Sequence, residues 1–178
     1  AGLIYLDDIS IALDCAASEL FNKDTYRLTG ENKKYSSEEM VVYIQSLVDK
    51  YEIKSVEDPF DETDWNAWKT FTNNNKDLQI VGDDIFVTQE KILTKGIENK
   101  VANSILIKLN QVGTLSETMQ TISLAKNNGY KTIISHRSGE TEDSFIADLA
   151  VAVDAGQIKT GAPARSDRTA KYLSLIHI

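Results

Sequence analysis

Short apolar runs alternate along the chain with longer segments in which apolar and polar residues recur at helical spacing. The apolar runs are rich in β-branched residues, as is typical of buried strands. They occupy residues 10–15, 53–58, 78–83, 104–109, 131–136 and 156–161. Regular alternation of strands with helices predicts an α/β fold built on a parallel sheet.

Local capping residues mark where the predicted helices begin. Ser36, followed by acidic residues, predicts a helix that runs to about Tyr51. Thr114 and Glu117 form a capping box for a second helix, and Gly129 suits its end. A third helix is predicted over residues 141–155, and an aromatic stripe within residues 65–71 predicts a short helix that packs on the core.

A polar residue stands at or near the end of every predicted strand. These residues are Asp14, Glu57, Asp83, Lys108, His136 and Lys159. In a (β/α)8 barrel such strand ends converge on one face, where active sites form. An open doubly wound sheet would normally carry a glycine-rich phosphate turn after its first strand, and the sequence has none there. The fold predicted is therefore α/β, a partial (β/α)8 TIM-type barrel in which strands can be counted for roughly six of the eight βα units; the resemblance described below implies that these are roughly the last six.

Charge and composition narrow the range of partners. The 178 residues include 27 acidic and 19 basic ones, a net charge of −8, which argues against nucleic-acid and membrane partners. No apolar run approaches the ~18 residues that a membrane span needs, and the N-terminus does not resemble a signal peptide. A lone cysteine, Cys15, excludes an intrachain disulfide. We expect a cytoplasmic protein.

The first three strand ends are carboxylates: Asp14, Glu57 and Asp83. A single buried acid is often a satisfied structural group, but three on successive strands repel one another unless a cation lies between them. Ligands that are all oxygen favour Mg²⁺ over zinc. Asp58 and Asp84 are alternative ligands, and the alternation of side chains along a strand predicts that only one of each adjacent pair points inward.

The remaining strand ends are basic. Lys108 lies within an apolar run and is a candidate general base. His136, Arg137, Ser138 and Lys159 supply hydrogen-bond donors and positive charge that suit a phosphate or carboxylate. A metal, a base and an anion clamp together favour removal of a proton beside a carboxylate, with the metal stabilising the charge that develops.

Six motifs together resemble the enolase family (phosphopyruvate hydratase): LDCAASE, SVEDPFDE, VGDD, ILIKLNQVGTLSET, SHRSGETED and GQIKTGAPARSDR. They are collinear from Leu13 to Tyr172 and look bacterial. The resemblance implies a Mg²⁺-dependent lyase of glycolysis that interconverts 2-phosphoglycerate and phosphoenolpyruvate, and a complete protein that is a homo-oligomer.

The resemblance also implies a role for each candidate residue. The metal ligands are Asp14, Glu57 and Asp83, of which Glu57 and Asp83 also bind substrate. Lys108 corresponds to the base that removes the C2 proton. The other substrate-binding residues are His136, Arg137, Ser138 and Lys159, with Arg137 and Ser138 on the phosphate and Lys159 near the carboxylate.

The sequence departs from the family in its extent. Enolases are more than twice as long, and neither the glutamate that acts as general acid nor the N-terminal loop that closes over the substrate has a counterpart here. Residues 1–172 are interpreted as an incomplete C-terminal barrel domain, and residues 173–178 (LSLIHI) as an atypical apolar tail in which His177 has no functional role. We expect the isolated fragment to be inactive and either prone to aggregate or dependent on a partner.

Two hypotheses remain open at this stage. The chain is part of a working enolase, or it is a non-catalytic barrel remnant that only binds Mg²⁺ or anions. A related enzyme that acts on another carboxylic acid is a weaker alternative, because SHRSGETED argues against it.

Overall fold

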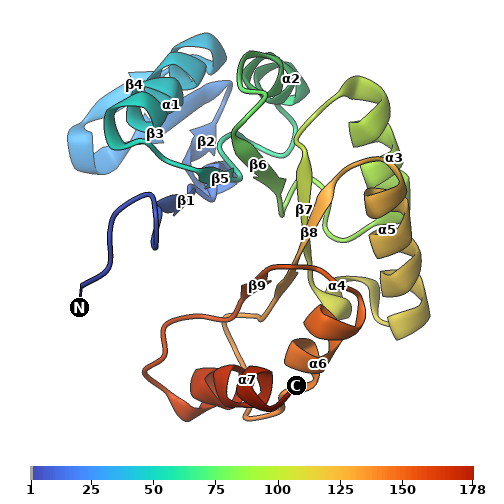
Figure 1. Cartoon of the computed structure of the whole chain (residues 1–178). Coiled ribbons are helices and arrows are strands. Elements are labelled where there is room, and N and C mark those ends of the chain that lie inside the picture. The colour runs from blue at the N-terminus through green and yellow to red at the C-terminus, as the bar shows by residue number, and fades with distance from the viewer. Residues whose placement is uncertain (1) are drawn as a thin grey trace. The chain divides into compact units, whose positions relative to one another are not determined.

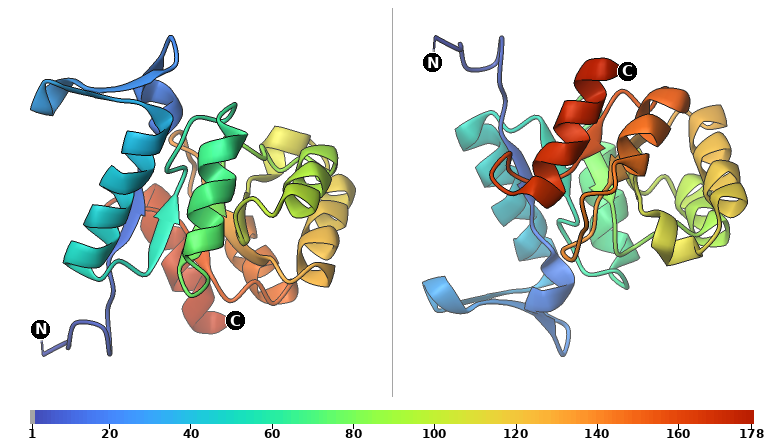
Figure 2. Two further views of the ribbon diagram at one scale, coloured as in Figure 1. Left: turned by 90° about the horizontal axis from the view of Figure 1, so that it is seen from above. Right: turned by 90° about the horizontal axis from the view of Figure 1, so that it is seen from below.

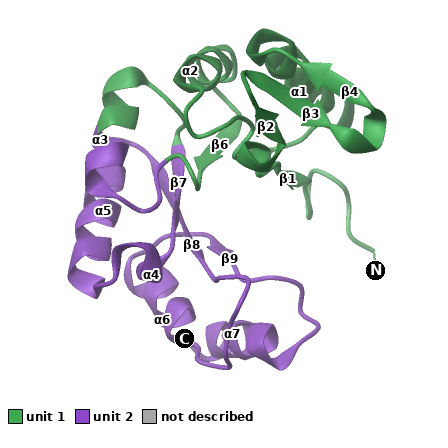
Figure 3. Cartoon of the chain, turned by 180° about the vertical axis from the view of Figure 1, so that it is seen from behind, with its two compact units in different colours: residues 1–85, 95–103 green, residues 86–94, 104–178 purple. Residues whose placement is uncertain are grey.

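The computed structural model describes residues 2–178 and divides the chain into two compact units. Unit 1 comprises residues 1–85 and 95–103, and unit 2 comprises residues 86–94 and 104–178 (Figure 3). Helix α3 (Glu90–Asn99) belongs partly to each unit. Among the described residues, no helix combines the length and the apolar character that crossing a membrane requires.

Every predicted strand is present in the larger sheet, although each is shorter than its apolar run. The strand order is β1-β5-β6-β7-β8-β9 (Figure 1). Within unit 1, β1 pairs with β5 and β5 with β6, and within unit 2, β7 pairs with β8 and β8 with β9, all in parallel. The strands are β1 (Ala12–Asp14), β5 (Ser55–Glu57), β6 (Gln79–Gly82), β7 (Ser104–Ile107), β8 (Lys131–Ser135) and β9 (Ile158–Lys159). This confirms the predicted α/β class with a parallel sheet.

In unit 1, helices α1 (Ser37–Tyr51) and α2 (Trp65–Asn74) lie side by side (Figure 2). The predicted start of α1 is correct: the Ser36 hydroxyl accepts a hydrogen bond from the Glu39 N–H at 3.2 Å, and the Glu39 carboxylate accepts one from the Ser36 N–H at 2.8 Å. Of the aromatic stripe on α2, Trp68 and Phe71 are fully buried, as predicted. Trp65 is half-buried, and the Lys95 ammonium lies 3.8 Å from the centre of its ring.

Unit 1 also contains a small antiparallel sheet that no pattern in the sequence predicted. Its strands are β2 (Phe21–Asn22), β3 (Thr25–Leu28) and β4 (Lys33–Tyr35), flanked by the 3-10 helices η1 (Ala17–Leu20) and η2 (Thr29–Glu31). Lys23 and Asp24 form the turn between β2 and β3, both in the left-handed backbone region at φ 48° and 64°. Strands this short and this polar carry no apolar run from which they could be recognised.

Unit 2 contains the helices α4 (Leu109–Val112), α5 (Leu115–Asn127), α6 (Phe145–Ala152) and α7 (Ser166–His177). Thr114 caps α5 as predicted, because its hydroxyl accepts a hydrogen bond from the Glu117 N–H at 3.2 Å. Helix α6 is shorter than expected: the Asp143 carboxylate accepts a hydrogen bond from the Phe145 N–H at 3.0 Å, and the helix begins only there. Residues 173–177, which belong to the segment interpreted as an atypical apolar tail (173–178), lie in the last part of α7.

Candidate active site

The three carboxylates predicted to bind a metal all belong to unit 1 and stand at the carboxyl ends of neighbouring parallel strands. Asp14 is the last residue of β1, Glu57 is the last residue of β5, and Asp83 follows the end of β6. Asp14 and Glu57 are direct partners in the strand register. The structure therefore places these residues at one edge of the sheet, as their sequence positions predicted.

The burial of these carboxylates differs. Glu57 is 7% exposed and Asp83 is 8% exposed, whereas Asp14 is exposed. Buried carboxylates that stand near one another repel, and a cation relieves that repulsion. Glu57 and Asp83 thus have the burial at which a carboxylate needs a compensating partner.

A compact group of acids also surrounds Asp83. Single oxygen atoms of Asp58, Asp83 and Asp84 all lie within 4.8 Å of one another. The alternation rule is wrong for Asp83 and Asp84, because both contribute to this one group. The physical reason is that β6 ends at Gly82, so these two residues are beyond the strand and no longer alternate between its faces.

Asp58 has a structural task within that group. One of its carboxylate oxygens accepts the Asp83 N–H at 2.9 Å and the other accepts the Asp84 N–H at 2.8 Å. Burial raises the pKa of Asp58 to about 8, although the two N–H groups oppose that shift and the negative charges of Asp83 and Asp84 add to it. Asp58 thereby ties the end of β5 to the residues that follow β6.

The pKa of the Cys15 thiol reflects the negative charge at the carboxyl ends of β1 and β5. Burial, together with the negative charges of Asp14, Asp58 and Glu57, raises the pKa of Cys15 to about 12. Three carboxylates therefore act on one sulfur atom, which stays protonated and is a poor metal ligand at neutral pH. The donor set at this edge consists of carboxylate oxygens, which fits a hard divalent cation.

Lys108 belongs to unit 2 and directly follows β7. Its backbone N–H donates to the Thr88 hydroxyl oxygen at 3.0 Å, and the Thr88 hydroxyl lies 2.7 Å from the side-chain oxygen of Gln111. Val87 and Thr88 are both β-branched and both have left-handed backbone angles, with φ 42° and 56°. Such conformations are strained for these residue types and cluster at functional sites.

The other predicted residues of unit 2 stand at the ends of β8 and β9. His136 to Ser138 follow β8, Lys159 is the last residue of β9, and the His136 N–H donates to the Lys159 carbonyl at 2.9 Å. Burial lowers the pKa of the His136 imidazole, and so do the charges of Arg168, Lys159 and Lys108; the Glu140 carboxylate opposes them. The two lysines thus influence the same imidazole ring, which agrees with a shared basic site.

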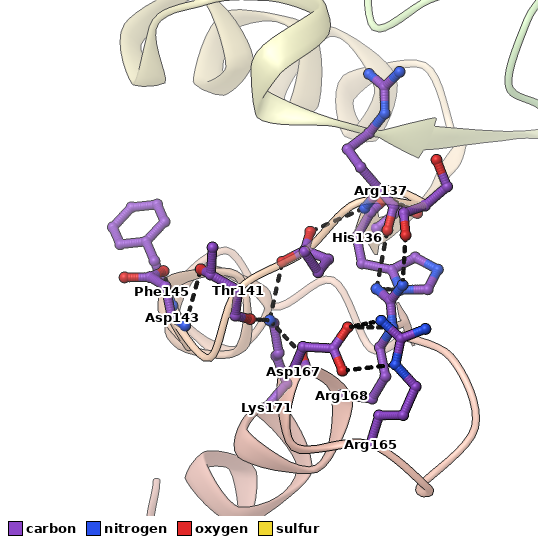
Figure 4. Close-up of polar contacts among 12 residues, drawn as sticks. His136, Arg137, Thr141, Asp143, Phe145, Arg165, Asp167, Arg168 and Lys171 are labelled. Carbon is purple, nitrogen blue, oxygen red and sulfur yellow. Dashed lines mark hydrogen bonds and ion pairs between the residues drawn. The ribbon is translucent and has the colours of Figure 1, made fainter.

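Three residues that contact the segment His136–Ser138 were not predicted to belong to the site. The Arg168 guanidinium contacts the His136 ring and the carbonyl oxygens of Arg137 and Ser138, as Figure 4 shows. The Glu140 carboxylate accepts the Arg137 N–H at 2.9 Å. The Arg137 guanidinium donates to the side-chain oxygen of Asn110 at 2.9 Å. Asn110 and Arg168 lie in the segments KLNQVGT and RSDR, but nothing in their spacing indicates these contacts.

Comparison with known families and proteins gives a consistent match. Over residues 1–178 the sequence matches the model of the family described as "Enolase, C-terminal TIM barrel domain". Among curated relatives, the enolases of Legionella pneumophila strains Lens and Philadelphia 1 are 56% identical over 180 residues, and that of strain Corby is 57% identical. Each alignment covers 100% of this chain and 42% of the relative, so the chain spans less than half the length of these proteins.

The comparison also decides between the barrel and the open doubly wound sheet. The matching family domain is a TIM barrel, and the parallel strands with their intervening helices agree with it. The prediction of a partial TIM-type barrel that resembles the C-terminal part of an enolase is therefore confirmed. A metal cofactor fits both this similarity and the acidic group in unit 1.

Proposed function

The chain belongs to the enolase family, and on that premise we propose that the full-length protein containing it is a phosphopyruvate hydratase. It interconverts 2-phosphoglycerate and phosphoenolpyruvate, a lyase reaction of glycolysis, and depends on Mg²⁺. We further propose that the complete protein is a cytoplasmic homo-oligomer. The observation that carries the proposal is the set of strand ends, with acids after β1, β5 and β6 and basic residues after β7, β8 and β9.

The carboxylates of Asp14, Glu57 and Asp83 are proposed to hold the Mg²⁺ ion. Their oxygen-only donor set and the burial of Glu57 and Asp83 support this assignment. When bound, the ion would stabilise the negative charge that develops on the substrate carboxylate as a proton leaves. Asp58 is assigned the separate task of fixing the backbone at Asp83 and Asp84, because its oxygens already accept their N–H groups.

Lys108 is proposed to remove the proton from C2 of 2-phosphoglycerate. Support comes from its position directly after β7 and from the hydrogen bond that ties its backbone to Thr88, since a base must be held in place to act. The strained backbone at Val87 and Thr88 is consistent with a segment whose conformation serves a site.

The substrate's anionic groups are proposed to bind to the residues after β8 and β9. The guanidinium of Arg137 and the hydroxyl of Ser138 suit the phosphate, and the ammonium of Lys159 suits the carboxylate. His136, whose backbone N–H donates to the Lys159 carbonyl, is proposed to donate a further hydrogen bond to the substrate. Glu57 and Asp83 are proposed to contact the substrate as well as the metal.

The competing proposal is a barrel remnant that binds Mg²⁺ or anions without catalysis. It arises because the chain spans 42% of its enolase relatives, so the similarity leaves the activity of the whole protein to be tested. The two proposals differ in turnover and agree in metal binding, so an assay of the reaction separates them.

The test measures phosphoenolpyruvate formation and exchange of the C2 proton by the full-length protein with Mg²⁺. We expect Lys108→Ala to abolish both while calorimetry shows Mg²⁺ binding nearly unchanged, because a base affects the transition state more than ground-state binding. Lys131→Ala, which changes an exposed lysine at the start of β8, is the matched control and should keep its activity. Mg²⁺ binding without turnover by the unmodified protein would instead support the remnant.

A further inference from the structure

Arg168, on helix α7, makes an unusual set of contacts for an arginine. The residue is 8% exposed, and its guanidinium reaches three consecutive residues of the proposed substrate-binding run. One terminal nitrogen, Nη1, bonds to Nδ1 of His136 and lies 2.9 Å from the Arg137 carbonyl oxygen. The other, Nη2, lies 2.9 Å from the Ser138 carbonyl oxygen (Figure 4).

The contact with His136 determines which ring nitrogen carries the proton. A guanidinium stays protonated in proteins and offers only donors. Nδ1 of His136 must therefore be the acceptor in this bond, which leaves the proton of the neutral ring on Nε2. Arg168 thus selects the tautomer in which His136 can donate a hydrogen bond from Nε2.

The contacts with the two carbonyl groups have a second consequence. Carbonyl oxygens carry partial negative charge and repel a phosphate or carboxylate. The Arg137 and Ser138 carbonyl oxygens both accept hydrogen bonds from Arg168, so they are held toward helix α7. The positive charge of the guanidinium offsets their partial negative charge. The backbone that carries the two proposed phosphate-binding side chains is thereby fixed in one conformation.

The surroundings of Arg168 keep its side chain in place. Its Nε lies 3.4 Å from the carboxylate of Asp167, which also pairs with Arg165 at 2.9 Å. Gly161 has φ 83°, and a Cβ atom there would come within 3.1 Å of both Arg168 Cδ and His136 Cε1. A side chain at residue 161 would therefore adopt a strained backbone conformation and would press against both Arg168 and His136.

We propose that Arg168 is a positioning residue, which holds His136 as an Nε2–H donor and fixes the backbone of Arg137 and Ser138 for binding an anionic group of the substrate. The inference rests on the proposed function of the 136–138 run. It adds a role for a residue of α7 that acts through these three residues without touching the substrate.

The first test leaves Arg168 unchanged. In the full-length protein with ¹⁵N-labelled histidine, the His136 signals are assigned by comparison with His136→Gln. We expect a neutral ring at pH 7 with its proton on Nε2, because burial and the charges of Arg168, Lys159 and Lys108 disfavour the cation more than Glu140 favours it. A proton on Nδ1, or a cationic ring, would overturn the inference.

The second test uses two variants of Arg168 and one control. Arg168→Lys keeps the charge but cannot reach the ring and both carbonyls at once, and Arg168→Gln removes the charge. For both we expect KM for 2-phosphoglycerate to rise roughly tenfold and the His136 ring to populate both tautomers. In Arg168→Gln the pKa of His136 should also rise. Arg165→Lys, at the N-cap position just before α7 and with an arginine side chain that is 71% exposed, should leave all three readouts unchanged.

The outcomes separate the two proposals. If the unmodified protein forms no phosphoenolpyruvate, the proposed function fails, and the tautomer of His136 still decides the role of Arg168. If the protein is active and both variants, folded by circular dichroism, keep the KM and the tautomer, Arg168 is not a positioning residue. If neither variant folds, the tautomer of His136 in the unmodified protein decides whether Arg168 positions the ring.

Discussion

Nζ of Lys171 lies 2.9 Å from Oε2 of Glu140, a residue 31 positions earlier in the chain. Lys171 is fully buried, and its ammonium also donates to the carbonyl oxygens of Thr141 and Asp167. The other oxygen of Glu140 accepts the Arg137 N–H. A buried lysine on α7 therefore fixes the loop that carries the proposed anion-binding residues.

Lys171→Met should destabilise the full-length protein by about 3–5 kcal/mol, the usual cost of removing one partner from a buried ion pair. The loss arises because the Glu140 carboxylate and two carbonyl groups lose their donor. Urea denaturation measures it, with Lys91→Met on the exposed side of α3 as the control. A loss of stability no larger than that of the control would mean that the pair contributes nothing.

The same pair predicts a pH dependence of stability. Burial alone would raise the pKa of Glu140, but the Arg137 N–H and the Lys171 ammonium outweigh it and hold that pKa below its usual value. The folded state then binds a proton at Glu140 less readily than the unfolded state, whose carboxyl group titrates near pH ~4.3. The stabilisation is therefore present above that pH and is lost as the pH falls through the folded pKa.

Glu140→Gln should accordingly lower the melting temperature at pH 7 and have little effect below the folded pKa of Glu140. Melting curves of the variant and the unmodified protein between pH 3 and pH ~7 measure this. Glu142→Gln, at an exposed neighbouring position, provides the control. A difference between Glu140→Gln and the unmodified protein that stays constant across this range would contradict the assignment.

Asp58→Asn should weaken Mg²⁺ binding roughly tenfold, as is common when a residue that orients metal ligands is lost. The variant's amide nitrogen cannot accept a hydrogen bond, so the N–H of Asp83 or of Asp84 loses its acceptor. Calorimetric titration with Mg²⁺ gives the affinity. Asp77→Asn, the same substitution at an exposed position, should bind as the unmodified protein does; equal affinities in all three proteins would rule out the role of Asp58.

Thr88→Val should cost about 1–3 kcal/mol of stability, because the Lys108 N–H loses its acceptor in a buried place. We also expect kcat to fall, since the backbone that carries the proposed base is no longer held. Thr88→Ser keeps the hydroxyl group and should retain most of the stability and most of kcat. Denaturation measures the stability of the two variants, and steady-state kinetics measures their kcat. Equal stability and equal kcat in Thr88→Val and Thr88→Ser would show that the Thr88 hydroxyl contributes to neither.

Much of the fold follows from short-range features of the sequence. The apolar runs that become β1 and β5 to β9 are rich in β-branched residues, and the caps of α1 and α5 use partners only three residues away at Ser36 and Thr114. The strand-end positions of the site residues follow as well, because parallel neighbours bring their carboxyl ends to one edge. Asp14 and Glu57, far apart in the sequence, meet in register for that reason.

Other features depend on contacts that no local pattern encodes. In the sequence RSDRTAKY, Arg168 and Lys171 look like exposed charges of a surface helix, yet both are buried. Burial of a charge requires partners, and theirs are a carboxylate, an imidazole and backbone carbonyls about 30 residues away, which only the folded chain brings to α7. The same limit applies to Asp58: its sequence position marks it as an acid at a strand end, but the bonds to Asp83 and Asp84 exist only because β5 and β6 pair.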